Sequence, residues 1–414
     1  MVLLMILMSL SVILGVYIIP VSETCLLVKS LQFNFKFLTA IGQIDSVSWN
    51  TLAEQTDPFH QYEFLAALEN SACVSIATGW QPQHLTIYQN KRLIGILPLY
   101  IKTHSYGEYV FDHPWANTYQ QYGLNYYPKL VCAIPFTPVT GARLLLDKSV
   151  DCEHLMGPLC EAIKHKVGSS GLSSMHWLFV PQALSDKLAN HQQLIRRSVQ
   201  FQWFNRDYTQ FADFLNALTS RKRKSIKKER HKLVEQGVKV RRLTGQDLTE
   251  QAMDFFYLCY QQTYLKRSGH KGYLSLALFR QLFTHMREKI LLVIAEIEGK
   301  PVASALYLYD QKTLYGRYWG SMVDVDNLHY ECCYYQGIEF CIDKGIAAFN
   351  PGTQGEHKIL RGFEPIYCYS NHWLDEPAFH DGVRRFLDHE HPMIEDYKKN
   401  AEALLPYKVI PDNA

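Results

Sequence analysis

The stretch LTIYQNKRLIGILPLYI, residues 85–101, places apolar residues on both sides of a Gln-Asn-Lys turn. Alternating or continuous apolar residues around a short polar turn predict a β-hairpin. The stretch VIAEIEGKPVASALYLY, residues 293–309, has the same layout around a Glu-Gly-Lys turn. When the two are aligned, apolar residues coincide although identity is low, which indicates a duplicated α/β unit. The alternative is two unrelated hairpins that share an alternating pattern.

Helical and strand patterns alternate along the rest of the chain. Amphipathic spacing predicts helices, and apolar runs predict strands at 175–180 and 314–320. The predicted helices are 45–55, 62–70, 152–166, 183–190 and 328–344. This order is typical of α/β proteins whose mixed sheets are flanked by helices. A chain of 414 residues is long enough for two domains, which we assign to 28–206 and 207–414.

The composition excludes several classes of function. The 42 Lys and Arg nearly balance the 40 Asp and Glu, so the net charge of +2 gives no general attraction to nucleic acid. Any anion site must therefore be local. The 10 cysteines are scattered without a Cys-x-x-Cys pair, and we expect reduced, buried thiols and no metal site. Isolated histidines such as His176 and His372 are interpreted as structural.

The N-terminal extension, residues 1–27, begins with 21 residues that carry no charge. Such a run is long enough to cross a hydrocarbon core about 30 Å thick, and membrane contact through residues 1–21 is one interpretation. Lys29 and Lys36 follow the run, which would leave the bulk of the chain in the cytoplasm. A translation start assigned too far upstream is the second interpretation, because a plausible first strand begins only near Val28. A cleaved signal is the third, although no Lys or Arg precedes the run.

The clearest charge feature is SRKRKSIKKERHKLVEQG, residues 220–237. It predicts a basic helix that Ser220 caps and Gly237 ends. The first turn would hold Arg221, Lys222, Arg223 and Lys224, at the end where the helix dipole disfavours cations. A bound phosphate would reverse that penalty, so these four residues are candidates for phosphate binding. The alternative is a solvated basic surface.

Several stretches together resemble the bacterial FemAB-like proteins. They include DPFHQYEFLAALENSACV from residue 57, HSYGEYVFDHPWA from 104, HYECCYYQGIEFCIDKG from 329 and GTQGEHKILRGFEP from 352. This family is a branch of the GNAT (N-acetyltransferase-like) superfamily and is related to Fem-type peptidoglycan aminoacyltransferases. The resemblance implies two tandem GNAT-like domains with mixed sheets.

The resemblance also implies a reaction. Fem-type relatives transfer an aminoacyl group from aminoacyl-tRNA to an amine of a peptidoglycan precursor, and ordinary GNAT enzymes transfer acetyl from acetyl-CoA. No tightly bound cofactor is expected, and the acyl donor would be aminoacyl-tRNA or acyl-CoA. The CoA pyrophosphate loop is incomplete here, because RYWGSM from residue 317 ends in Met322 where a small residue is expected. CoA is therefore the less favoured donor.

The segment GTQGEHKILRG, from residue 352, gathers groups that suit amine attack on an activated carbonyl. Glu356 or His357 would accept the proton of the amine. Lys358 and Arg361 would hold a substrate phosphate or carboxylate, and Gln354 would contact the substrate. The alternative is that Glu356 pairs with one of these cations on the surface.

Two further places complete the candidate site. Glu331 lies at the start of the helix predicted over 328–344, where the dipole keeps a carboxylate ionised and available as a base, or simply favours an acid. On the strand from 314 to 320, strict alternation would place Tyr315, Arg317 and Trp319 on one face and Tyr318 on the other. Tyr315 and Arg317 are therefore expected to contact the substrate.

Together these features predict an acyltransferase or aminoacyltransferase that acts on an amine, most plausibly in a cell-envelope precursor on the cytoplasmic side of the membrane. One alternative is an acetyl-CoA-dependent N-acetyltransferase of a small molecule or protein. The other is a module that recognises glycopeptide without catalysis.

Overall fold

The structure is a computed structural model that describes residues 33–54, 57–353 and 355–408. The N-terminal extension and Gln354 lie outside the described residues. Among the helices that are described, none combines the length and the apolar character that a membrane span requires. The described cysteines are free thiols, as expected.

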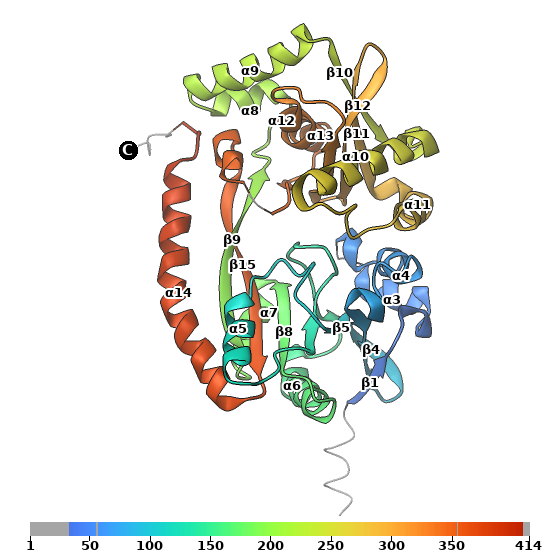
Figure 1. The fold of residues 1–414 in the computed structure, drawn as a ribbon, viewed down its shortest axis with the longest axis vertical. Coiled ribbons are helices and arrows are strands. Elements are labelled where there is room, and N and C mark those ends of the chain that lie inside the picture. Colours follow the sequence, from blue (N-terminus) through green and yellow to red (C-terminus); the bar gives the residue numbers. More distant parts are fainter. Residues whose placement is uncertain (1–32, 55–56, 354, 409–414) are drawn as a thin grey trace, which may run out of the picture.

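The described strands form one large mixed sheet and one smaller antiparallel sheet (Figure 1). In the described part of the chain the large sheet has the order β10-β11-β12-β13-β14-β9-β15-β8-β6-β5-β2, and the small one β1-β3-β4-β7. The strands are β1 (Asn34–Leu38), β2 (Trp80–Pro82), β3 (His84–Gln89), β4 (Arg92–Leu97), β5 (Leu99–Lys102), β6 (Lys129–Cys132), β7 (Leu145–Leu146), β8 (Ser174–Val180), β9 (Leu194–Phe204), β10 (Val238–Thr244), β11 (Ile290–Ile297), β12 (Lys300–Tyr309), β13 (Thr313–Ser321), β14 (Ala348–Asn350) and β15 (Glu364–Leu374).

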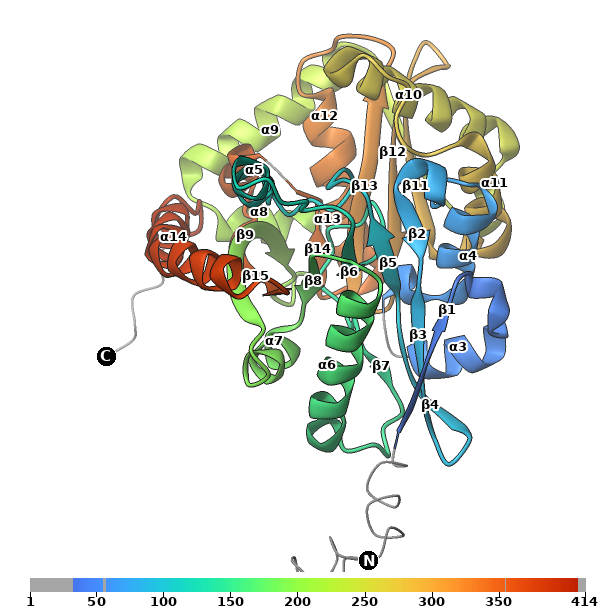
Figure 2. The same ribbon diagram turned by 60° about the horizontal axis from the view of Figure 1, so that its bottom comes forward.

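The longer helices cover the faces of these sheets (Figure 2). They are α3 (Ser46–Ala53), α4 (Tyr62–Asn70), α5 (His113–Gln121), α6 (Cys152–Ser169), α7 (Gln182–Ala189), α8 (Phe211–Ala217), α9 (Ser220–Glu235), α10 (Glu250–Ser268), α11 (Leu276–His285), α13 (Gln336–Lys344) and α14 (Pro377–Ala403). The short helix α12 (Leu328–Tyr330) and a π-helical turn (Glu331–Tyr335) lead into α13, so the helix predicted over 328–344 is present with a π-helical turn inside it.

The same order of elements occurs twice. We call β1 to β9 the first half and α8 to α14 the second half. In the first half β1, α3–α4, β3, β4–β5, β6, α6 and β8 follow one another, and in the second half β10, α10–α11, β11, β12, β13, α12–α13 and β14 do so. Each run contains one parallel pair, β6 with β8 and β13 with β14. The duplicated α/β unit predicted from the two hairpins is therefore present.

The two halves exchange their last strands. β9 of the first half pairs with β14 of the second half, and β15 of the second half pairs with β8 of the first half. β9 and β15 also pair with each other, antiparallel, along Glu364 to His372 (Figure 1). The predicted domain boundary at residue 206 therefore follows β9 directly in the sequence. The large sheet nevertheless continues from one half into the other.

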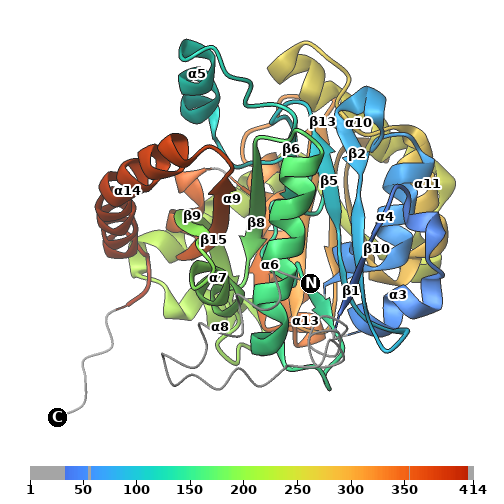
Figure 3. The same ribbon diagram turned by 90° about the horizontal axis from the view of Figure 1, so that it is seen from below.

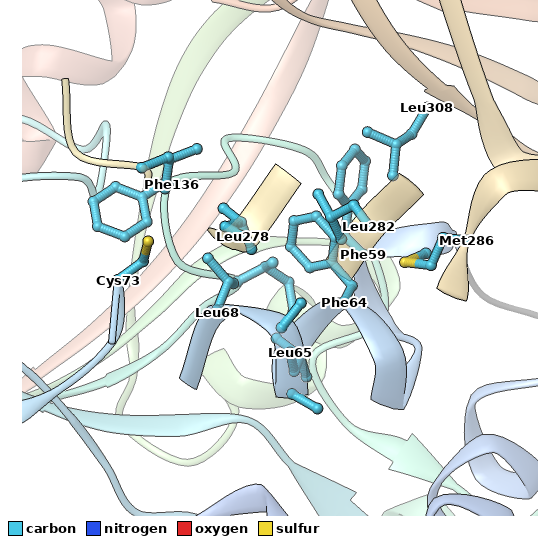
Figure 4. Packing of buried hydrophobic residues seen from close by; sticks show 14 of the residues in the cluster. Phe59, Phe64, Leu65, Leu68, Cys73, Phe136, Leu278, Leu282, Met286 and Leu308 are labelled. Carbon is cyan, nitrogen blue, oxygen red and sulfur yellow. The ribbon is translucent and has the colours of Figure 1, made fainter. Parts of the chain in front are cut away.

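The halves also share a hydrophobic core. Figure 4 shows Phe64 and Leu68 of α4 packed toward Leu278 and Leu282 of α11. On the opposite faces, α6 packs on the first half and α13 on the second, each with its own core. In the view of Figure 3, α5 and α14 lie at one edge of the molecule, where Trp115 and Tyr119 pack with Leu387.

Two local departures from the sequence predictions have simple causes. The second arm of the hairpin predicted within residues 85–101 is broken at Pro98 into β4 and β5, which belong to different sheets. Proline lacks the N–H that a continuous ladder needs. Ser220 does not cap α9: the N-cap is Thr219, without a side-chain hydrogen bond, while Gly237 beyond the helix has the expected positive φ of 74°.

Candidate active site

A cavity opens where two parallel strands separate. β13 and β14 are paired as far as Tyr315 and Asn350. Beyond that pair lies a cavity of about 470 Å³. Its walls come from the end of β13, from α10, from the helical segment 329–334 and from the segment 351–358, while Tyr109 and Pro138 close it from the first half. Ligands of open α/β sheets bind beyond the carboxyl ends of parallel strands, so this is the candidate active site.

His357 is the predicted proton acceptor that lies in the cavity wall. Its Nε2 atom is 2.7 Å from the hydroxyl of Tyr334. Burial, with the nearby cations of Lys358 and Arg361, lowers the pKa of His357 below its usual value of 6.5. The ring is therefore neutral near pH 7, which is the form that accepts a proton.

His329 lines the same cavity beside His357, with ring centroids 5.9 Å apart. Burial, helped by His357 and Arg267, lowers the pKa of His329 to about 3. Two neutral imidazoles thus stand together in a cavity whose described lining contains no Asp or Glu.

Lys358 also lines the cavity but is already engaged. Its ammonium is buried and donates hydrogen bonds to the carbonyls of Gly352 and Thr353, at 2.7 and 2.8 Å. Burial lowers its pKa to about 7. Through these two hydrogen bonds Lys358 stabilises the segment that follows β14. The alternative surface pair with Glu356 is absent from the described contacts, since exposed Glu356 accepts a hydrogen bond from Tyr397 instead.

Arg361 lies outside the cavity lining and is held by protein groups. Its guanidinium contacts Glu229 at 3.2 Å, donates to the Tyr335 hydroxyl at 3.1 Å and lies 3.3 Å from the centre of the Tyr330 ring. The segment from Glu356 to Arg361 is a 3-10 helix rather than a loop that enters a strand. Arg361 thus supports the back of this segment.

The structure does not bring Glu331 to the cavity. Its buried carboxylate accepts two hydrogen bonds from Arg230, at 2.9 and 3.0 Å, and one from Gln336 at 2.7 Å. It borders a different hollow, of about 450 Å³, between α8, α9 and β10. These hydrogen bonds occupy the carboxylate oxygens of Glu331 with protein partners and link α9 to the helical segment of Glu331, so its observed contacts are structural.

The prediction of which β13 side chains share a face of the sheet was wrong, because the side chains of this strand do not alternate strictly. The pairing with β12 skips Arg317, which makes it the extra residue of a β-bulge. Tyr315 and Tyr318 consequently pack toward the same core, between α4 and α11, whereas Trp319 packs toward the α13 side. Arg317 lines the cavity, while Tyr315 is buried and is not part of the described cavity lining.

The basic run lies outside the cavity. Arg221, Lys222, Arg223 and Lys224 occupy the first turn of α9, and none of them forms an ion pair with a described carboxylate. Partial burial and then the nearby cation of Arg361 lower the pKa of Lys222. The first turn of α9 is therefore close to the back of the 3-10 helix that carries His357.

Several residues that line the cavity were not predicted as site residues from the sequence. Arg267 and Tyr264 belong to a helix whose pattern gave no functional signal, and Tyr334 and His329 belong to a helix that was examined only for Glu331. The sequence feature that points to these four residues is the aromatic and basic content of the stretches around residues 264 and 330.

The comparison with family models matches residues 40–409 to FemAB_like, described as peptidoglycan biosynthesis/recognition. No curated protein sequence matches the chain significantly. Among solved structures, FemX is similar with a TM-score of 0.50 and 11% identity, over 81% of this chain and 98% of FemX.

Two other solved structures are also similar to this chain. A tandem GNAT protein from the clavulanic acid biosynthesis pathway has a TM-score of 0.46 and 11% identity, over 84% of this chain and 99% of that one. L-PGS from Bacillus licheniformis has a TM-score of 0.46 and 9% identity, over 78% and 95%. The predicted mixed α/β fold of two similar units is thus shared with FemX, and the chain belongs to the FemAB-like family.

Proposed function

We propose that this chain is an acyltransferase that moves an activated acyl or aminoacyl group to an amine of a peptidoglycan precursor. The family description supports the setting in peptidoglycan metabolism. The observation that carries the reaction type is the pair of neutral histidines, His357 and His329, in a cavity beyond the parallel strands β13 and β14. Amine attack on an ester or thioester needs such a neutral base and a space for both reactants.

In the proposed reaction, the neutral nitrogen of the amine attacks the carbonyl carbon of the donor. A new C–N bond forms and the carbonyl becomes an oxyanion, which collapses as the bond to the donor oxygen or sulfur breaks. His357 accepts the proton that the nitrogen loses and then donates it to the departing oxygen or sulfur, so that the ring returns to its neutral form. The hydroxyl of Tyr334, bonded to Nε2 of His357, holds the ring in place during this exchange.

The donor in this proposal carries phosphate, as aminoacyl-tRNA and acyl-CoA both do. The unpaired cations at the start of α9, which lie close to the segment of His357, support a path for donor phosphates from the cavity toward α9. Replacing Arg221 and Arg223 with Gln should weaken donor binding and change the free energy of unfolding by less than about 1 kcal/mol.

A donor screen tests the proposal. The chain is mixed with peptidoglycan precursors and either aminoacyl-tRNA or acyl-CoA, and mass spectrometry follows the acceptor. We expect the acceptor to gain one aminoacyl or acyl group with a single class of donor. If no donor of either class modifies any precursor, and precursors bind nonetheless, the chain is a recognition module and the proposal is wrong.

A further inference from the structure

The cavity gathers positive charge without an acidic counterpart. Arg267, Arg317 and Lys358 all line it, and no Asp or Glu occurs among its described lining residues. Within the described part of the chain, neither Arg267 nor Arg317 forms an ion pair, and the ammonium of Lys358 has only carbonyl partners.

Arg317 is half-buried, whereas Arg267 is exposed. Three other arginines that are buried or half-buried have a glutamate partner. Arg196, Arg230 and Arg361 each pair with a glutamate, at N–O distances of 2.6, 2.9 and 3.2 Å. A cation taken out of bulk water is costly unless an anion compensates it. The fold supplies that anion at these three arginines, whereas half-buried Arg317 has no ion-pair partner among the described residues, so a negative charge from a ligand fits beside Arg317.

The position of Arg317 is built rather than incidental. The β-bulge makes Arg317 the unpaired residue of β13, and bulges commonly redirect a side chain beside a functional site. Its Nη2 donates to the carbonyl of Phe136, from the first half, at 2.5 Å. The guanidinium also lies 5.4 Å from the ring of Phe59 and 5.5 Å from that of Tyr318. These contacts leave further N–H donors of the guanidinium for a ligand.

The absence of a carboxylate from the described cavity lining affects how easily His329 and His357 are protonated. The cations of Arg267 and Lys358 oppose protonation of His329, and Lys358 opposes protonation of His357, in addition to the effect of burial. A base that resists protonation is a weak base. An anion placed among these cations would cancel part of their field and make either ring easier to protonate.

We propose that Arg267 and Arg317 form an anion-binding subsite that is filled by a carboxylate or phosphate of the reacting substrate, and that this negative charge is required for proton transfer to His357. The second clause rests on the proposed function, whereas the first does not. A carboxylate would belong to the acceptor, and a phosphate would belong to the donor.

The first test needs no turnover. The chain is labelled at histidine and the titration of His357, identified by the loss of its signal in His357→Gln, is followed by NMR with and without glutarate or pyrophosphate. We expect a saturating anion to raise the pKa of His357 by about one unit or more. The rise should vanish in the double variant Arg267→Gln/Arg317→Gln and persist in Arg384→Gln, an exposed arginine on α14. An unchanged pKa with both anions, or an equal rise in the double variant, would overturn the subsite.

The second test identifies the source of the anion. Nα-acetyl-lysine and its carboxamide are compared as acceptors with the donor that the screen identifies. If the acceptor supplies the anion, the acid should react at least tenfold faster than the amide, and the double variant should remove the preference. If pyrophosphate but not glutarate shifts His357 and the two acceptors react equally, the donor phosphate fills the subsite. Absence of transfer to any acceptor would refute the proposed function, while the titration would still decide on the subsite.

Discussion

The ring of His357 is held from two sides. The Tyr334 hydroxyl lies 2.7 Å from Nε2, and Gly355 lies against the other edge of the ring. A Cβ atom on Gly355 would be 2.2 Å from Cε1 of His357, which is closer than two carbon atoms can approach. Position 355 also has a φ of 105°, which favours glycine. The orientation of the proposed base therefore depends on its neighbours.

The variant Tyr334→Phe tests this dependence. It removes the hydroxyl and keeps the ring, so we expect kcat to fall by roughly 10- to 100-fold, as for other partners that orient a catalytic or ligating histidine, with KM little changed. Tyr397→Phe is the control, because the Tyr397 hydroxyl contacts only exposed Glu356. An unchanged kcat in Tyr334→Phe would show that the hydrogen bond has no role.

His176 and His372 are structural, as the sequence analysis expected. They are buried on β8 and β15 with their Nδ1 atoms 2.7 Å apart, and their Nε2 atoms each face a serine hydroxyl at 2.8 Å. One Nδ1 must donate and the other accept, so both rings are neutral in complementary tautomers. Burial holds the pKa of each well below 6.5.

This pair predicts a pH dependence of stability. Below pH 6.5 the unfolded chain binds protons at these histidines and the folded chain does not, so the free energy of unfolding falls as the pH falls. The slope is about 1.4 kcal/mol per pH unit for each histidine, and it vanishes above pH 6.5. Urea unfolding at pH 7.5 and 5.5 measures it. The double variant His176→Asn/His372→Asn should lose the part of the slope that these two histidines contribute, while buried His329 keeps its own contribution, and exposed His154→Gln should keep the whole slope. Equal slopes in all three would refute the interpretation.

At the scale of single elements, most predictions came from local patterns. The hairpins and α4, α6 and β8 follow from apolar periodicity within a few residues, and the structure has them close to the predicted bounds. The break at Pro98 was readable from the missing N–H. The bulge at Arg317 was not, because the stretch reads as a regular strand and the skipped pairing depends on β12.

The contact between β13 and α10 gives a prediction at this scale. A Cβ atom on Gly320 would be 1.8 Å from the carbonyl oxygen of Cys259 in α10. Gly320→Ala should therefore lower the free energy of unfolding by about 3 kcal/mol or prevent folding, because neither backbone can yield easily. Gly168→Ala is the control, since its Cβ meets nothing within 4 Å in α6 and alanine favours a helix. Chemical denaturation compares the two, and equal stabilities would contradict the close packing.

At the scale of the whole molecule, the sequence indicated the duplication but not how the halves join. The exchange of β9 and β15 depends on pairing between residues far apart, such as His176 and His372, which are 196 positions apart. The site shows the same limit. His357, Lys358 and Arg317 were singled out from their own stretches, whereas the sequence left two roles open for Glu331, because its partner Arg230 lies 101 positions earlier in the chain.

The exchange predicts that the halves do not unfold separately. The last strand of each half pairs with a strand of the other half, and the halves share the core between α4 and α11, so neither has a complete sheet alone. We expect one unfolding transition in urea, with the same midpoint by circular dichroism and by tryptophan fluorescence, although chains with two units often show two. Two separate transitions would contradict the coupling.

The most direct test of the account compares the transfer rate of the wild-type chain with that of His357→Gln, using the donor and acceptor from the screen. If His357 accepts the proton of the amine, kcat should fall by about 100-fold or more while donor affinity stays within a few-fold. The control His154→Gln, on an exposed histidine, should keep the wild-type kcat. A wild-type kcat in His357→Gln would contradict the assignment of this cavity as the place of reaction.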